Sequence, residues 1–145
     1  MNILVLGSGA REHSICWAVK KSKTCDKLFC SPGNAGIQKI AECKFINLKK
    51  RIKILNFCEK NSIDLVIIGP EEYLADGVSD YLQNEGIKTF GPVKKAAKLE
   101  TSKSFAKSFL LKNKILTPKY RKFTAVNKAL NYLNSINFPI VIKAD

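Results

Sequence analysis

Three short segments combine glycine with charged or amide side chains, the residue types that bind small anions and hydroxyl groups. They are Gly7-Ser8-Gly9-Ala10-Arg11-Glu12, Ser31-Pro32-Gly33-Asn34-Ala35-Gly36 and Gly69-Pro70-Glu71-Glu72. Glycine allows the backbone to approach a ligand closely, and polar side chains beside it supply hydrogen bonds. Any one of these segments could be a plain turn. The occurrence of all three after apolar runs favours a site for a small anionic ligand.

The first segment is compatible with a dinucleotide site at two positions and incompatible at a third. Gly7 and Gly9 follow an apolar run, but Glu12 stands where a dinucleotide fold needs a third small residue. A dinucleotide site also needs an acid at the end of the second strand to bind ribose. No acid follows the second apolar run, and the nearby Asp26 precedes it. A nicotinamide or flavin site is therefore disfavoured, although it remains one alternative.

Alternating strand and helix patterns predict an α/β fold with an open, doubly wound parallel sheet. The expected strands are residues 3–6, 27–30, 45–47, 64–68, 88–90 and 139–143, and the expected helices are residues 11–22, 49–60, 74–84 and 101–112. In such a sheet, ligands bind beyond the carboxyl ends of the strands. The three glycine-containing segments are therefore expected to line one rim.

Two lysines stand out against their predicted surroundings. Lys103 lies in the first turn of a helix with Thr101 as its expected N-cap, where the helix dipole disfavours a cation. The stripe of that helix expected to be buried contains Ser102, Phe105, Ala106, Phe109 and Leu110. Lys143 continues the apolar strand 139–143, and its burial would be costly without an anion. The alternative explanation for Lys103 is coincidence in a lysine-rich chain. The alternative for Lys143 is a strand end whose side chain reaches water.

The composition excludes several classes of function. The chain has 145 residues and a net charge of +13, but its lysines are spread along the sequence, which disfavours nucleic-acid binding. No apolar run is long enough to span a bilayer, and neither a leader pattern nor a membrane partner is expected, so cytoplasm is the predicted location. Five cysteines without a CxxC spacing and a single histidine indicate reduced core thiols and no metal site.

Five motifs together resemble the glycinamide ribonucleotide synthetase family of ATP-grasp ligases. They are GSGAREH, PGNAG, DLVIIGPE, GPVKKAAKLETSKSFAKSF and PIVIKAD. The resemblance implies a Rossmann-like pre-ATP-grasp domain at residues 1–100 that binds substrate. It implies the beginning of an ATP-grasp domain at residues 101–145.

The resemblance also implies a reaction and a set of binding residues. Members of the family ligate glycine to 5-phosphoribosylamine with ATP, giving glycinamide ribonucleotide, ADP and phosphate in purine biosynthesis. The residues implied on the 5-phosphoribosylamine side are Gly7, Gly9, Arg11, Glu12, Asn34, Gly36 and Glu71, and those implied for ATP are Lys103 and Lys143. His13 could contact substrate, or it could only pack or cap the first helix. Mg²⁺ or Mn²⁺ is expected for the whole enzyme, with no metal ligand and no catalytic residue in this chain.

The resemblance ends before the family's glycine-rich phosphate loop, its metal ligands and most of its glycine pocket. We therefore expect this chain to be inactive by itself, and a second chain carrying the rest of the ATP-grasp domain is one expected partner. The sequence does not specify an oligomeric state. A non-catalytic module that binds a sugar phosphate or a nucleotide is the alternative function.

Overall fold

The structure, a computed structural model, describes residues 1–145. It divides into two compact units, residues 1–97 and residues 98–145. None of its helices combines the length and the apolar character needed to cross a membrane.

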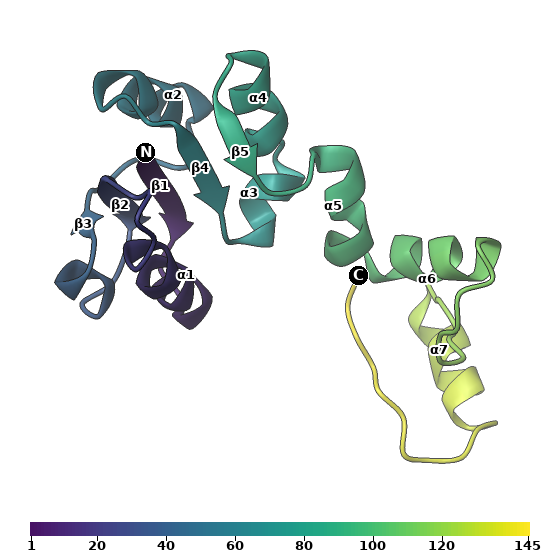
Figure 1. Ribbon diagram of the computed structural model, residues 1–145. Helices are drawn as coiled ribbons and strands as arrows, with labels where there is room; N and C mark the ends of the chain where they lie inside the picture. Colours follow the sequence, from purple (N-terminus) through teal and green to yellow (C-terminus); the bar gives the residue numbers. More distant parts are fainter. The chain divides into compact units, whose positions relative to one another are not determined.

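The first unit contains a parallel sheet of five strands in the order β3-β2-β1-β4-β5 (Figure 1). The strands are β1 (Asn2–Gly7), β2 (Lys27–Pro32), β3 (Glu42–Cys43), β4 (Leu65–Ile68) and β5 (Lys88–Phe90). The chain begins in the middle of the sheet and moves outward in one direction before crossing to the other side. This order confirms the predicted α/β class and the doubly wound topology.

The helices of the first unit are α1 (Ala10–Lys20), the 3-10 helix η1 (Ile37–Lys39), α2 (Arg51–Lys60), α3 (Glu71–Ala75) and α4 (Val78–Asn84). Helix α5 (Lys94–Thr101) crosses the boundary between the two units. The single helix predicted at residues 74–84 is wrong, because the chain forms α3 and α4 there. Gly77, with φ +77°, takes a left-handed conformation that ends one helix and begins the next.

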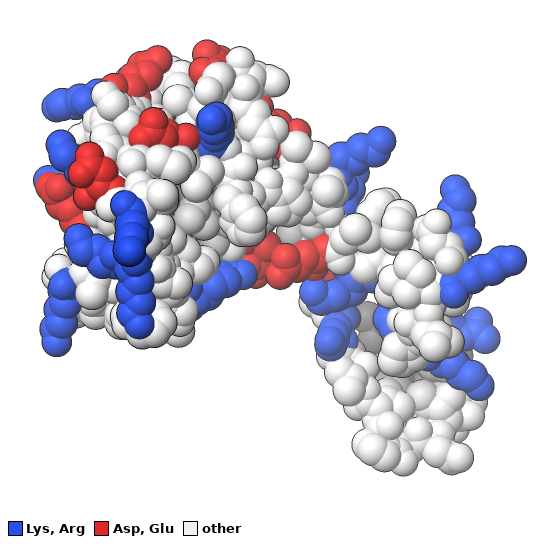
Figure 2. Space-filling model, viewed as in Figure 1, with Lys and Arg blue, Asp and Glu red and all other residues white.

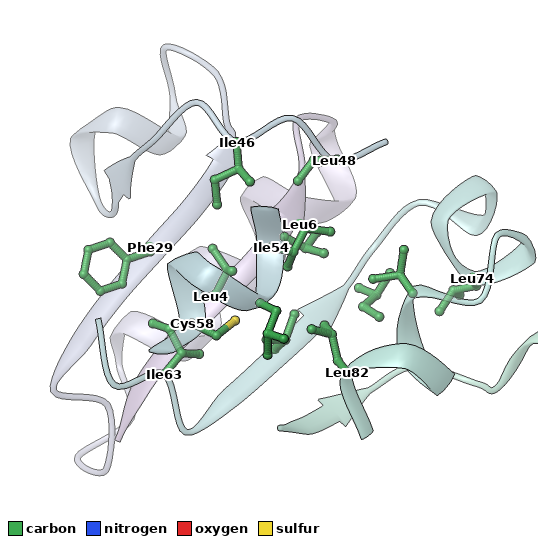
Figure 3. Packing of buried hydrophobic residues seen from close by; sticks show 14 of the residues in the cluster. Leu4, Leu6, Phe29, Ile46, Leu48, Ile54, Cys58, Ile63, Leu74 and Leu82 are labelled. Carbon is green, nitrogen blue, oxygen red and sulfur yellow. The ribbon is translucent and has the colours of Figure 1, made fainter. Parts of the chain in front are cut away.

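The sheet separates two apolar layers, and alternate residues of β1 face opposite ways. Leu4 and Leu6 pack with the buried residues of α2 and α4 in the larger layer (Figure 3). Ile3 and Val5 pack on the opposite face in a smaller layer that includes Cys16 from α1. Because β1 is buried on both faces, it reads as a continuous apolar run, which is typical of a central parallel strand.

The strand predicted at residues 45–47 is wrong. The short strand β3 lies earlier, where Glu42 and Cys43 pair with Phe29 and Cys30 of β2. Ile46 instead enters the core from a loop, and its amide donates to Ser31 Oγ at 3.1 Å. The apolar run therefore reflects packing by one loop residue rather than pairing in the sheet.

The second unit contains α6 (Lys103–Lys112) and α7 (Val126–Leu133). Thr101 is not the N-cap, since it ends α5, and Ser102 caps α6 by accepting a hydrogen bond from the Phe105 amide. The stripe expected to be buried on α6 is only half-buried, with Phe105 40% and Phe109 39% exposed. Helix α7 was not predicted, although its apolar residues have helical spacing.

The strand predicted at residues 139–143 is also wrong. These residues form no regular element, and Val141 and Ile142 are 80% and 76% exposed. A strand needs a neighbouring strand to pair its backbone groups, and the second unit contains none. Lys143 is consequently exposed, so burial in a strand does not distinguish it from other lysines.

Candidate functional site

The three glycine-containing segments meet at the carboxyl edge of the sheet. They follow β1, β2 and β4, which are adjacent in the order β2-β1-β4. The Gly33 amide donates to the Gly7 carbonyl at 3.1 Å, and the Gly69 amide donates to the Leu6 carbonyl at 3.2 Å. The structure therefore confirms that the three segments converge on one rim. We call this rim, formed by residues 7–12, 31–36 and 69–72, the glycine rim.

Glu12 lies beneath the glycine rim and is only 3% exposed. Its Oε2 accepts a hydrogen bond from the Gly9 amide at 2.7 Å, and its Oε1 accepts one from Arg11 Nε at 3.0 Å. A Cβ added at Gly7 would lie 2.6 Å from Glu12 Cγ, and one added at Gly69 would lie 2.1 Å from Glu12 Oε1. The position of a third glycine in a dinucleotide fold is thus taken by a carboxylate that the surrounding glycines accommodate.

The hydrogen bond from the Gly9 amide to Glu12 decides which backbone amides can face an anion. The Gly9 amide is engaged by Glu12, so it is not directed at a ligand. The amides of Ala10 and Arg11 lie in the first turn of α1, where backbone N–H groups have no intrahelical acceptor. The positive end of the helix dipole lies at the same place. Anion binding at this turn would use these amides and the Arg11 side chain.

Arg11 links the first and third segments of the glycine rim. Its Nε contacts Glu12, and its Nη2 lies 3.3 Å from Glu71 Oε2, with both side chains about half exposed. The pKa of Arg11 is raised above its ordinary value. The hydrogen bond to Glu12 contributes most to this shift, and the hydrogen bond to Glu71 contributes next. The guanidinium therefore stays charged and lies between one buried and one exposed carboxylate.

Asn34 organises the second segment. Its Oδ1 accepts hydrogen bonds from the amides of Gly36 and Ile37, each at 2.9 Å, and its Nδ2 donates to the Ser8 carbonyl at 2.8 Å. A Cβ added at Gly36 would lie 2.7 Å from His13 Cε1, so His13 packs against this segment. These contacts fix the shape of the rim and favour the packing role considered for His13.

The two lysines implied for ATP belong to the second unit. Lys103 Nζ donates to the Glu100 carbonyl at 3.0 Å, and Asp145 Oδ1 accepts from the Ser104 amide at 2.9 Å. Hydrogen bonds from Ser104 hold the pKa of Asp145 well below its usual range. Asp145 thus brings the end of the chain, with Lys143 two residues before it, beside the first turn of α6.

Several features of these sites were missed from the sequence. Gly69 was expected only to form part of a turn, yet together with Gly7 it leaves room for the Glu12 side chain. The sequence feature that could have indicated this role is the position of Gly69 directly after an apolar strand. The hydrogen-bond network of Ser102, Ser104, Lys122 and Asp145 had no signal, because it joins residues far apart in the sequence.

The structure contains no group of three or more His, Cys, Asp or Glu side chains that could hold a metal ion. The five cysteines are free thiols, of which Cys16, Cys30 and Cys58 are buried. Burial raises the pKa of Cys58 to about 12, which keeps its thiol neutral.

Two family models match the chain. The model described as "Phosphoribosylglycinamide synthetase, N domain" matches residues 1–100. The model described as "Phosphoribosylglycinamide synthetase, ATP-grasp (A) domain" matches residues 101–145.

Curated relatives with similar sequences are named phosphoribosylamine–glycine ligase. The one from Clostridium acetobutylicum is 43% identical over 145 residues, covering 100% of this chain and 35% of the relative. The one from Fusobacterium nucleatum is 46% identical over 144 residues, covering 99% of this chain and 34% of the relative. The chain thus spans about a third of the length of the curated relatives it matches.

Solved structures show the same fold. The phosphoribosylamine–glycine ligase of Thermotoga maritima has a TM-score of 0.67 and 27% identity, covering 94% of this chain and 31% of that chain. The N5-carboxyaminoimidazole ribonucleotide synthetase of Thermus thermophilus has a TM-score of 0.71 and 18% identity, with 94% and 37% covered. The second likeness concerns the fold alone. With a model match over residues 1–100, and with the parallel sheet and glycine rim in place, the chain belongs to the phosphoribosylglycinamide synthetase family.

Proposed function

We propose that the protein is a phosphoribosylamine–glycine ligase, which joins glycine to 5-phosphoribosylamine with ATP in purine biosynthesis. In this proposal, residues 1–100 bind 5-phosphoribosylamine, and residues 101–145 contribute to the binding of ATP. The names of relatives at 43–46% identity support the activity. The single observation that supports the substrate site is the convergence of three glycine-containing segments at the carboxyl edge of the sheet.

The proposed substrate carries groups that complement the glycine rim. Its phosphate would lie at the first turn of α1, against the amides of Ala10 and Arg11 and the Arg11 guanidinium. Glu71, on the facing segment, would accept hydrogen bonds from the ribose hydroxyls or from the amine. Glu12 and Asn34 would hold the rim in shape through the backbone contacts described above.

The charge of the second unit supports an anionic nucleotide there. Residues 98–145 contain ten Lys and Arg residues but only two acids, and Figure 2 shows separate blue side chains across that unit. Lys103 and Lys143 are the residues proposed to contact ATP. Since they are the only nucleotide contacts proposed in this chain, we expect it to bind ATP weakly.

The chemistry requires three anionic reactants to be held together while a phosphoryl group moves to the glycine carboxylate and the amine captures the acyl phosphate. Mg²⁺ or Mn²⁺ would neutralise phosphate charge in the proposed enzyme, and no residue of this chain is assigned to it. The contribution of this chain is to bind and orient the sugar phosphate. The free cysteines fit a reducing compartment such as the cytoplasm.

Isothermal titration calorimetry with ribose 5-phosphate, a stable analogue of the amine substrate, tests this proposal. Arg11→Ala should weaken binding about tenfold, because it removes a charged donor to the phosphate. Glu71→Ala should weaken it less, since that change also frees Arg11. The control is Glu42→Ala, which breaks a comparably exposed ion pair with Lys44, both residues lying outside the three rim segments. Equal binding by all four proteins would refute the assignment of the rim to the sugar phosphate.

Titration with ATP provides a separate check on the second unit. The proposal expects weak binding by this chain that decreases further in Lys103→Ala. Tight binding that is unchanged in Lys103→Ala and in Lys143→Ala would contradict the proposed roles of both lysines.

A further inference from the structure

We propose that Glu71 is a specificity-determining residue that competes with an anionic ligand for Arg11. A simple anion that takes the place of Glu71 on Arg11 Nη2 supplies no donor to Glu71 in exchange. A ligand that carries both an anion and hydroxyl or ammonium donors supplies new partners for Arg11 and Glu71 together. This inference rests on the proposed function, because it concerns the same rim.

The geometry separates a fixed contact of Arg11 from an exchangeable one. Its Nε contacts Glu12, whose side chain is 4% exposed and also accepts the Gly9 amide. Its Nη2 contacts Glu71, whose side chain is 53% exposed. The buried carboxylate therefore holds Nε of the guanidinium, while the contact of Nη2 with Glu71 lies at the surface.

The charges explain why the second contact opposes an anion. Arg11 lies between two carboxylates, Glu12 and Glu71, so one formally positive side chain faces two formally negative ones. A phosphate approaching Arg11 would meet the Glu71 carboxylate at the rim. When Glu71 moves away, Arg11 and Glu12 balance each other, and the first turn of α1 adds its positive dipole end.

The cost of this exchange is small enough for a ligand to overcome. An exposed ion pair contributes little to stability, and its loss corresponds to a change of about two- to fivefold in an equilibrium constant. The Arg11–Glu71 distance of 3.3 Å and the half exposure of both side chains place it in this class. Glu71 should therefore weaken the binding of a simple anion by about that factor.

The experiment compares inorganic phosphate, ribose 5-phosphate and ribose on the whole chain by calorimetry or NMR titration. The test variant is Glu71→Gln, which keeps the size of the side chain but removes its charge. The control is Glu42→Gln, which raises the net charge equally and removes a carboxylate of similar exposure, 57%, from an ion pair with Lys44. Circular dichroism establishes that each variant is folded.

We expect Glu71→Gln to affect the binding of the two ligands differently. Glu71→Gln should bind inorganic phosphate about two- to fivefold tighter than the parent chain, while it loses part of the preference for ribose 5-phosphate over phosphate. Glu42→Gln should change neither quantity by more than the general effect of one added charge.

The outcomes distinguish this inference from the proposed function. Phosphate binding that is weaker or unchanged in Glu71→Gln, or equally tightened in Glu42→Gln, would overturn the competition between Glu71 and the anion. Tighter phosphate binding in Glu71→Gln alone, without any preference of the parent chain for ribose 5-phosphate, would uphold the competition and refute the sugar-phosphate assignment. Binding of neither ligand by any variant would overturn both.

Discussion

Replacement of Glu12 by Ala tests whether the buried carboxylate holds the glycine rim together. The residue is 3% exposed, and its side chain accepts hydrogen bonds from the Gly9 amide at 2.7 Å and from Arg11 Nε at 3.0 Å. Truncation leaves an empty space beneath Gly7 and Gly69, where the carboxylate now lies. We expect the first unit to lose both stability and the shape of its rim.

The magnitude follows from the individual contacts. The charged hydrogen bond to the Gly9 amide accounts for about 2 kcal/mol. The half-exposed pair with Arg11 adds about 0.5 kcal/mol, and a buried methylene group adds about 0.8 kcal/mol. Removal of the carboxylate also removes its desolvation cost, so we expect a net loss of about 2–3 kcal/mol. For a unit of this size, that loss lowers Tm by roughly 10–20 °C.

Urea unfolding followed by the fluorescence of Trp17 and by circular dichroism measures this loss. Trp17 is the single tryptophan of the chain and belongs to α1, so it reports on the first unit. Glu42→Ala is the control, since it removes an exposed carboxylate from the same unit. A loss of less than 1 kcal/mol in Glu12→Ala, or one no larger than in the control, would refute the structural role given to Glu12.

Two further predictions concern the core of the first unit. Leu82→Ala, at a side chain with 0% exposure, should cost about 2–5 kcal/mol in urea unfolding, whereas Phe45→Ala, at 90% exposure, should stay within about 0.5 kcal/mol; similar losses would contradict the packing. Burial raises the pKa of the Cys58 thiol from 9.0 to about 12, so the stability that this neutral thiol contributes is present below pH 9 and is lost as pH rises toward 12. At pH 8.5, a thiol reagent should therefore modify the partly exposed Cys25 before Cys58, with modification of Cys58 requiring urea, and rapid labelling of Cys58 in the folded chain would show that it is not buried.

The sequence determined the fold class and the elements with strong periodicity. The apolar run of β1 between polar residues predicted a strand buried on both faces, and the glycines after it predicted a turn at the carboxyl edge. Because parallel strands bring their carboxyl ends to one edge, the predicted parallel sheet was enough to expect the three segments on one rim, and the structure added that their strands are adjacent. The motifs indicated the family before any contact was known, and two family models agree with it.

Tertiary structure decided the elements that depend on a distant partner. Residues 139–143 have a strand-like sequence, but they find no neighbouring strand, whereas Glu42 and Cys43 form β3 because β2 lies beside them. The orientation of Glu12 was equally beyond sequence reasoning. Its carboxylate lies under the rim because Gly69, far along the chain, leaves the space for it. Local sequence specifies which residues can form a strand or a turn, but pairing and burial depend on which segments the fold brings together.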